Sequence, residues 1–461
     1  MIWFLLQKVG FYIFIILTIY FTYKKKYESL LALYFFGMAF ATCYYFYITI
    51  WFPTKIIALG IVLCLFLESY KRKSPAISLV YLIFILFAVV ILLSDIIGIA
   101  FPGTYAPQLN RYMRMFNANY SYLTTVALLF FGLILERGFV KRTFPSYCLA
   151  VEIAIAFGLI HYVCLKLGIG FMPILRQNGT VNLEALARMG SHVVQRVYGV
   201  SGESKNLGFL ICPYLLILIM MWGQGVYRIN KTYHLIALAV GIFVLVHTYS
   251  SSALLNFIFA VPIMMLLLPF PFPKITYKVG TIILLVCIVG CFWSLAKNTD
   301  LYPSASGESS FITQIYERTF VRAQDELEND RQEVVVFNHF INNENVLFKI
   351  FGWGGSQYTF QVPGQSFGNA LIPLQSGLIL TIVDFGLWGL LLIGFVGYVI
   401  IKILFLSIRS SNYYALAFSI ASLSTFIGSL MFGTIVTCFI YLMLAIYAYY
   451  DEQEASIVTN E

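Results

Sequence analysis

The sequence predicts an all-α protein, a polytopic bundle of transmembrane helices, and two observations carry this prediction. First, 60% of the 461 residues are hydrophobic and only 11% are charged, with a mean hydropathy of +0.84. Soluble globular chains carry about 25% charged residues. Second, apolar runs of about 20 residues recur along the chain, and a helix of that length crosses a bilayer. We therefore expect a single integral membrane domain over residues 1–461.

The apolar runs predict about thirteen spans, with about twelve or fourteen as alternatives, because one run is short and the last two nearly adjoin. In chain order the expected spans are residues 3–23, 30–50, 56–67, 76–97, 120–135, 146–167, 207–222, 233–247, 253–270, 281–296, 378–405, 413–426 and 432–449.

Basic residues predict the orientation of these spans. Of the 29 Lys and Arg, 15 fall in connections at alternate ends of the spans, namely 24–26, 71–73, 137–142, 228–231, 274–278 and 402–409. Basic connections of this kind stay in the cytoplasm. The net charge of +8 is therefore interpreted as an orientation signal, and no nucleic-acid partner is expected.

Three longer segments, 101–119, 168–205 and 298–370, are then expected on the external face. The last of them holds nine acidic and four basic residues. Its part 311–343 predicts one or two amphipathic helices that lie along the membrane or cap the bundle. All eight cysteines fall inside apolar runs, and the five histidines show no metal-ligand spacing. We therefore expect no disulfide framework, no metal site and no cofactor.

The stretch that begins at Arg196 is the sharpest candidate for chemistry. Gly199 and Gly202 allow its backbone to bend closely around a bound group. Arg196, Glu203 and Lys205 accompany them just before an apolar run. A guanidinium suits a phosphate, and a carboxylate can transfer a proton. The pattern predicts a site for an anionic headgroup, and the alternative is an interfacial turn with snorkelling cations.

Arginines in the segment 298–370 are further candidates for phosphate binding. Arg318 and Arg322 stand four residues apart, so a helix would project them from one side. Arg331 and His339 follow within the same segment. The alternative is that the arginines pair with neighbouring carboxylates along the helix surface, and that His339 is a packed loop histidine.

Ionisable residues inside expected spans form a third group of candidates, since lipid makes them costly. Asp384 is the clearest of them, and Glu152 and Asp95 also qualify. The alternative role for each is a hydrogen bond between helices inside the bundle.

Three motifs resemble the O-antigen polymerase and ligase superfamily of bacterial envelopes, most closely its Wzy-type polymerases. They are Arg196-x-x-Gly199 … Asn206 at the start of a span, Arg331 followed by FGWGG at 351–355, and DFGLWG at 384–389. The ligases carry a His-Asn pair about nine residues before the acidic position of the last motif, where this chain has Gln375 and Ser376. The family's Ser-Arg between two central spans is replaced by serines at 250–252. The missing histidine favours a polymerase over a ligase.

The resemblance implies a metal-independent glycosyltransferase in the bacterial inner membrane, with its active site on the periplasmic face. Its substrate would be an undecaprenyl-pyrophosphate-linked oligosaccharide, polymerised into O-antigen of lipopolysaccharide or a capsular-type polysaccharide. Arginines would clamp the pyrophosphate, and Glu203 or Asp384 would act as the base. Membrane lipids, a chain-length regulator and a flippase are the implied partners. The alternatives are a ligase that transfers polysaccharide to lipid A–core, and a transporter or flippase of lipid-linked sugars.

Overall fold

The computed structural model describes residues 2–41, 53–68, 75–267 and 332–458, apart from 108, 172–173, 176–180, 183–185, 190–191, 368–369, 372–373, 375, 411 and 433–434. Contacts group the chain into two compact units. Unit 1 comprises residues 1–14, 35–53 and 145–329, and unit 2 comprises 15–34, 54–144 and 330–461. Each unit is described by itself below.

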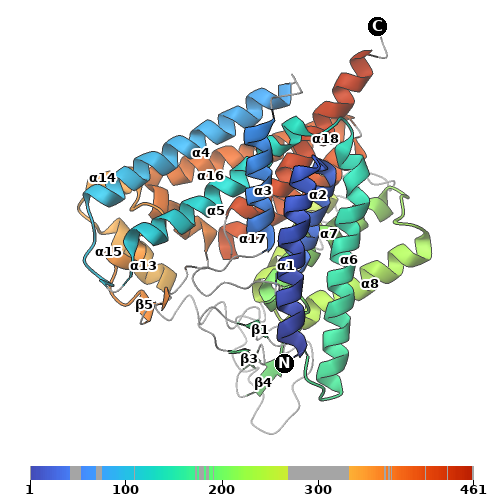
Figure 1. The fold of residues 1–461 in the computed structure, drawn as a ribbon, viewed down its shortest axis with the longest axis horizontal. Coiled ribbons are helices and arrows are strands. Elements are labelled where there is room, and N and C mark those ends of the chain that lie inside the picture. The colour runs from blue at the N-terminus through green and yellow to red at the C-terminus, as the bar shows by residue number, and fades with distance from the viewer. Residues whose placement is uncertain are drawn as a thin grey trace. The chain divides into compact units, whose positions relative to one another are not determined.

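Helices dominate both units (Figure 1). The helices up to residue 267 are α1 (Ile2–Tyr23), α2 (Tyr27–Ala39), α3 (Pro53–Leu67), α4 (Pro75–Ala100), α5 (Arg111–Phe131), η1 (Gly132–Ile134), α6 (Phe139–Lys166), α7 (Ser204–Gly223), α8 (Lys231–His247) and α9 (Ser251–Leu267). Those after residue 331 are α13 (Gln332–Ile341), α14 (Val346–Phe351), α15 (Tyr358–Gln361), α16 (Gly377–Ser410), α17 (Tyr413–Phe432), η4 (Ile435–Cys438) and α18 (Phe439–Val458).

The described strands are short and form three antiparallel pairs. These pairs are β1 (Ile174–Leu175) with β2 (Val181–Asn182), β3 (Leu186–Met189) with β4 (His192–Gln195), and β5 (Ser366–Phe367) with β6 (Ala370–Leu371). In the longest pair, Met189 lies opposite His192. The strands belong to connections between helices, so the expected all-α class is confirmed.

Six helices of the described chain are long and apolar enough to cross a membrane, namely α1, α4, α6, α7, α16 and α17. Shorter apolar helices lie within α3, α8, α9 and α18. The protein is thus a multi-pass membrane protein by helix length and hydropathy. The expected span 281–296 lies outside the described residues, so the total of about twelve to fourteen spans stays a prediction.

Helix α5 begins earlier than the sequence predicts. We expected residues 101–119 to connect two spans, but α5 already starts at Arg111. Asn110 explains this start, because its side-chain oxygen accepts a hydrogen bond of 3.0 Å from the backbone N–H of Met113. An asparagine in this position caps the helix and replaces a missing intrahelical acceptor.

In unit 2, α4 packs against both α5 and α16, and α17 packs against both α16 and α18 (Figure 1). Aromatic rings interlock in this core: Phe87 of α4 meets Phe439 of α18 edge to face at 5.1 Å between ring centroids. Gly132 lies so close to the ring of Tyr447 that a Cβ there would stand 2.3 Å from its Cε2 atom. These contacts define the helix packing of unit 2.

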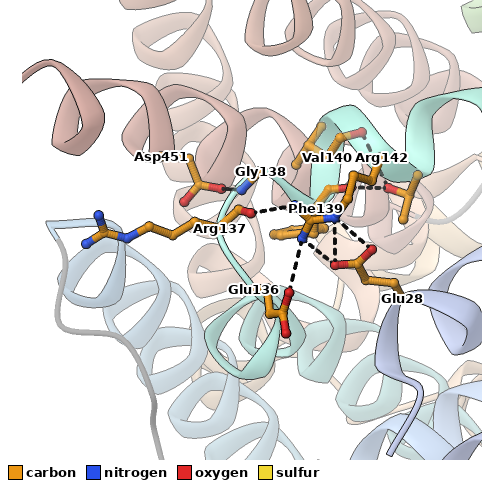
Figure 2. A network of polar contacts seen from close by, with 9 residues as sticks. Glu28, Glu136, Arg137, Gly138, Phe139, Val140, Arg142 and Asp451 are labelled. Carbon is orange, nitrogen blue, oxygen red and sulfur yellow. Dashed lines mark hydrogen bonds and ion pairs between the residues drawn. The ribbon is translucent and has the colours of Figure 1, made fainter.

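A polar network at one end of unit 2 joins α2, α6 and α18. Figure 2 shows Arg142 donating through Nε to both carboxylate oxygens of Glu28, at 3.1 and 3.0 Å. The backbone N–H of Gly138 donates to Asp451 at 3.0 Å (Figure 2). Arg137 and Arg142 are among the basic residues that we expect on the cytoplasmic side, and Glu28 offsets the charge of Arg142.

Helix α16 contains a sharp bend at Gly386, whose φ of 64° and ψ of −143° are not helical. A Cβ on Gly389 would stand 2.3 Å from the carbonyl oxygen of Thr381. In a straight helix, residues that far apart are separated by about 12 Å along the axis. The short segment 377–385 therefore folds back over the longer segment 387–410. That longer segment, about 24 residues and about 36 Å, is long enough to span a bilayer alone.

Candidate functional site

The first candidate site lies in unit 1, where α7 and α9 run parallel. A Cβ on Gly208 of α7 would stand 2.4 Å from the Cβ of Ala253 in α9. Further along both helices, the side-chain nitrogen of Asn256 lies 3.6 Å from the sulfur of Cys212. Contacts that advance together along two helices mean that their N-termini lie at the same end. Each helix N-terminus carries about half a positive charge, so the pair forms a local positive field.

Buried hydroxyl groups surround these two N-termini. Ser204, the first residue of α7, is only 2% exposed. Its hydroxyl has no hydrogen-bond partner among the residues that the structure describes. Ser250 and Ser252, at the start of α9, are also buried and lie 3.1 Å apart through their hydroxyl oxygens. An orphaned buried hydroxyl beside two helix N-termini is suited to contact a bound anion.

The predicted Arg196 belongs to the same part of unit 1. Its Nε donates a 3.0 Å hydrogen bond to the carbonyl oxygen of Thr248, just before α9. The N–H of Val197 donates to the carbonyl of His247 at 3.0 Å. Thr248 in turn lies beside Gly208 of α7, since its Oγ1 would be 3.6 Å from a Cβ there. Arg196 is thus anchored next to the paired N-termini, and its side chain is half-buried.

Glu203 and Lys205 lie at the beginning of α7. Glu203 occupies the N-cap position with an extended backbone, and its side chain makes no capping hydrogen bond. It is exposed, whereas Lys205 in the first turn is half-buried. The structure therefore groups Arg196, Glu203 and Lys205 at one end of the α7–α9 pair. This group supplies two cations, a carboxylate and helix N–H groups, which is the chemistry that the sequence predicts for an anionic headgroup.

The predicted Asp384 belongs to unit 2 and is buried, with 1% of its surface exposed. It lies just before the bend of α16, against a segment that we call the glycine loop (352–356). The N–H groups of Trp353 and Gly354 donate to the carbonyls of Val383 and Asp384, each at 2.9 Å. The bend frees these carbonyls from the helix, and the glycine loop satisfies them.

The glycine loop also binds two carboxylates. Ser356 donates its N–H to Oδ1 of Asp384 at 3.1 Å, and Gly355 donates its N–H to Oδ1 of Asp95 at 3.3 Å. The amide of Asn119 donates to the other oxygen of Asp95. The hydroxyl of Tyr122 lies 3.5 Å from the other oxygen of Asp384. Asp95 and Asp384 thus hold the glycine loop between α4 and α16, and their contacts with Asn119 and Tyr122 of α5 fit the alternative role, a hydrogen bond between helices.

A small apolar core stabilises this arrangement. The cluster consists of Val336, Phe340, Phe348, Trp353, Tyr358, Val362, Leu374 and Val383. It joins α13, α14 and α15 to the short segment of α16. Burial raises the pKa of the Tyr358 hydroxyl above its ordinary value, so this group stays neutral at physiological pH.

The remaining predicted residues are His339 and the three arginines of the segment 298–370, and the structure describes only His339 among them. His339 is exposed on α13, with its ring 6.2 Å from that of Trp353 between centroids. Arg318, Arg322 and Arg331 lie outside the described residues, so their role stays a prediction. Of the expected amphipathic region 311–343, α13 is the described part.

Glu152 fulfils the structural alternative that the sequence left open. Its Oε1 accepts hydrogen bonds from the hydroxyl of Tyr214 at 2.8 Å and from Nε of Arg228 at 3.1 Å. Both ionic side chains are largely buried, with 17% of Arg228 and 11% of Glu152 exposed. This ion pair ties α6 to the connection between α7 and α8 inside unit 1.

Sequence reasoning did not select Ser204, Asn119 or Tyr122, although all three lie within the candidate clusters. Single serine, asparagine and tyrosine residues occur throughout the apolar runs, so no pattern distinguishes these three. Ser204 stands beside Glu203, however, and a serine at the start of a predicted helix was an available signal.

No protein-family model matches the sequence, and no curated protein matches it. The fold and the two clusters define the chain as a multi-pass helical membrane protein with a cationic cluster in unit 1 and, in unit 2, two carboxylates, of which Asp384 is buried and Asp95 half-buried.

Proposed function

We propose that the protein is a membrane glycosyltransferase that polymerises undecaprenyl-pyrophosphate-linked oligosaccharide repeats on the outer face of the plasma membrane. The observation that carries the proposal is the pair of parallel helix N-termini in unit 1, with Arg196 anchored beside them. The buried hydroxyl of Ser204 at the same place has no hydrogen-bond partner among the described residues. A pyrophosphate is the dense, doubly anionic group that such a site favours. The motif resemblance supplies the substrate class, an oligosaccharide linked to a lipid pyrophosphate.

In the proposed reaction, a hydroxyl at the non-reducing end of a new repeat attacks the anomeric carbon of the growing chain. The bond between that carbon and the pyrophosphate oxygen breaks, and the lipid pyrophosphate leaves with the bonding electrons. Arg196, Lys205 and the helix N–H groups stabilise its added negative charge. The acceptor proton passes to a carboxylate, and the products are a longer chain and free lipid pyrophosphate.

Of the two carboxylates that the sequence offers as the base, the contacts favour Glu203. It is exposed at the N-cap of α7, where a sugar hydroxyl can approach it. Asp384 is 1% exposed and already accepts a hydrogen bond from the N–H of Ser356. A base needs hydrogen-bond access to the proton that it removes. We therefore assign proton transfer to Glu203 and the positioning of the glycine loop to Asp384.

Replacement of Arg196 tests the proposal directly. Arg196→Ala, at the wild-type protein level in the membrane, should abolish long polysaccharide chains, because the leaving group loses its forked cation. Arg196→Lys is the matched control: it keeps the charge but not the bidentate geometry, and should give partial activity. An unchanged chain-length distribution in Arg196→Ala would overturn the assignment.

A polymerase and a ligase differ in the acceptor that they require. Purified protein supplied with the lipid-linked repeat alone should lengthen it. A strict requirement for a lipid A–core acceptor would instead identify a ligase.

One observation favours a transporter as the second candidate. Helix α16 is interrupted at Gly386 beside the buried Asp384, and broken helices mark substrate sites in many transporters. The two candidates separate in detergent, where no membrane divides two compartments. A polymerase lengthens its lipid-linked substrate there, whereas a transporter leaves every substrate molecule chemically unchanged.

A further inference from the structure

A buried histidine of α6 contacts the turn that carries Arg196 and Glu203. Nδ1 of His161 accepts hydrogen bonds from two consecutive backbone N–H groups, that of Tyr198 at 3.1 Å and that of Gly199 at 3.3 Å. His161 itself is only 2% exposed.

The imidazole ring is fixed in one orientation. It stacks on Phe171 with 4.2 Å between centroids and 11° between planes. Tyr198 meets it edge to face at 4.1 Å. Because Nδ1 accepts, the proton of the neutral ring resides on Nε2. The ring therefore presents a single acceptor to the turn.

A second contact holds the turn on the same face of α6. Gly199, with a φ of +52°, lies against Gly158, and a Cβ on Gly199 would stand 3.1 Å from the backbone nitrogen of Gly158. Residues three apart on a helix share a face. Gly158 therefore provides the space for the turn, and His161 provides its acceptor.

We propose that His161 is a positioning residue that fixes the 198–202 turn and thereby the placement of Arg196 and Glu203 on either side of it. The proposal rests on the proposed function for what these two side chains do, but not for the geometry itself. Hydrogen bonds to two adjacent N–H groups set the direction in which the backbone leaves Arg196 and enters α7. Loss of this acceptor removes a hydrogen bond from each of two buried backbone N–H groups, which favours a different turn.

Two substitutions of His161 distinguish the effect of its hydrogen-bond acceptor from the effect of its stacked ring. His161→Phe keeps an aromatic ring against Phe171 but removes the acceptor. His161→Asn loses the stacked ring but offers an amide oxygen close to the position of Nδ1. At equal protein level, the Phe variant should lose on the order of 100-fold in kcat/KM for the lipid-linked repeat, since small displacements of catalytic groups have effects of this size. The Asn variant should recover most of that loss.

A readout that needs no polymerisation keeps this inference distinct from the proposed function. In membranes, Glu203→Cys is treated with a membrane-impermeant maleimide, and mass spectrometry follows the labelled fraction at position 203. Adding His161→Phe should change this labelling rate, and adding His161→Asn should restore it. Unchanged labelling and activity in the Phe background, or equal impairment of both variants, would overturn the inference. If labelling changes but the Arg196→Ala variant keeps wild-type polymer length, the proposed function is rejected and the positioning role of His161 is retained.

Discussion

The backbone of Gly352 lies directly against the carbonyl group of Asp384. A Cβ on Gly352 would stand 2.3 Å from both the carbonyl carbon and the carbonyl oxygen of Asp384. On the other side of this contact, a Cβ on Gly386 would stand 2.6 Å from the nitrogen of Gly352. Both glycines have positive φ, of 78° and 64°. Two glycines from separate motifs thus interlock the glycine loop with the bend of α16.

This interlock predicts that alanine is not tolerated at either glycine. Gly352→Ala or Gly386→Ala adds a methyl group where only backbone atoms can give way, in a conformation that L-residues disfavour. We expect each to reduce the free energy of unfolding by about 3 kcal/mol or more. The thermal unfolding midpoint in detergent, followed by fluorescence-detected size exclusion, measures the effect.

Two matched glycines separate the clash from the backbone strain. Gly364→Ala has a similar φ of +74° but open space around its Cβ, so it reports strain alone. Gly394→Ala, further along α16, has neither strain nor a contact within 4 Å and should be neutral or slightly stabilising. Equal unfolding temperatures for Gly386→Ala and Gly394→Ala would contradict the interlock.

The roles assigned to the two carboxylates predict opposite responses to amide substitution. Asp384→Asn keeps an oxygen that accepts from Ser356 and offers its nitrogen to the hydroxyl of Tyr122, so activity should be within about tenfold of wild type. Glu203→Gln removes the proposed base and should reduce kcat by about 100-fold or more. Single-turnover assays of lipid-linked repeat lengthening compare the two variants.

Asp384→Leu completes this comparison. It removes both acceptor oxygens, takes from the part-buried N–H of Ser356 its bond to this side chain, and should destabilise the protein by about 1–3 kcal/mol. A strong loss of activity in Asp384→Asn at unchanged thermal stability would instead make Asp384 a catalytic base.

The hydroxyl of Ser204, which has no partner within the described part of the chain, predicts a modest contribution to anion binding. Ser204→Ala should raise KM for the lipid-linked repeat about fivefold, the equivalent of one hydrogen bond of about 1 kcal/mol. Ser407→Ala is the control, because the hydroxyl of Ser407 is buried but already donates to the carbonyl of Ile403 at 2.7 Å. A Ser204→Ala variant with unchanged KM would remove this hydroxyl from the site.

The helices could be predicted from the sequence because apolar length is a local property. The predicted span 207–222, for instance, corresponds to α7, Ser204–Gly223. The bend at Gly386 could not be predicted, since a glycine inside an apolar run is compatible with a straight helix. Its cause is the glycine loop, about thirty residues earlier in the chain. N–H groups of this loop donate to the carbonyls of Val383 and Asp384, in place of the N–H groups of the next helical turn.

The candidate site shows the same division between local and long-range information. Arg196, Glu203 and Lys205 were predicted because they are adjacent in sequence and precede a span. The contribution of α9 was not predicted, since its parallel alignment with α7 depends on the contact between Gly208 and Ala253. His161 was missed for a similar reason: its partners at 198 and 199 are separated from it by a long connection.

The buried ion pair of Glu152 and Arg228 predicts a non-additive response to substitution. Glu152→Leu leaves a largely buried guanidinium without its carboxylate and should cost about 3–5 kcal/mol of stability. Adding Arg228→Met removes that uncompensated charge, so the double variant should be more stable than Glu152→Leu alone.

Glu28→Gln is the control. It affects the more exposed ion pair with Arg142 (Figure 2) and should cost less than about 1 kcal/mol. Thermal unfolding of the wild type, both single variants (Glu152→Leu and Arg228→Met), the double variant and Glu28→Gln in one detergent measures these differences. Additive losses in the double variant would mean that Glu152 and Arg228 stabilise unit 1 through independent contacts.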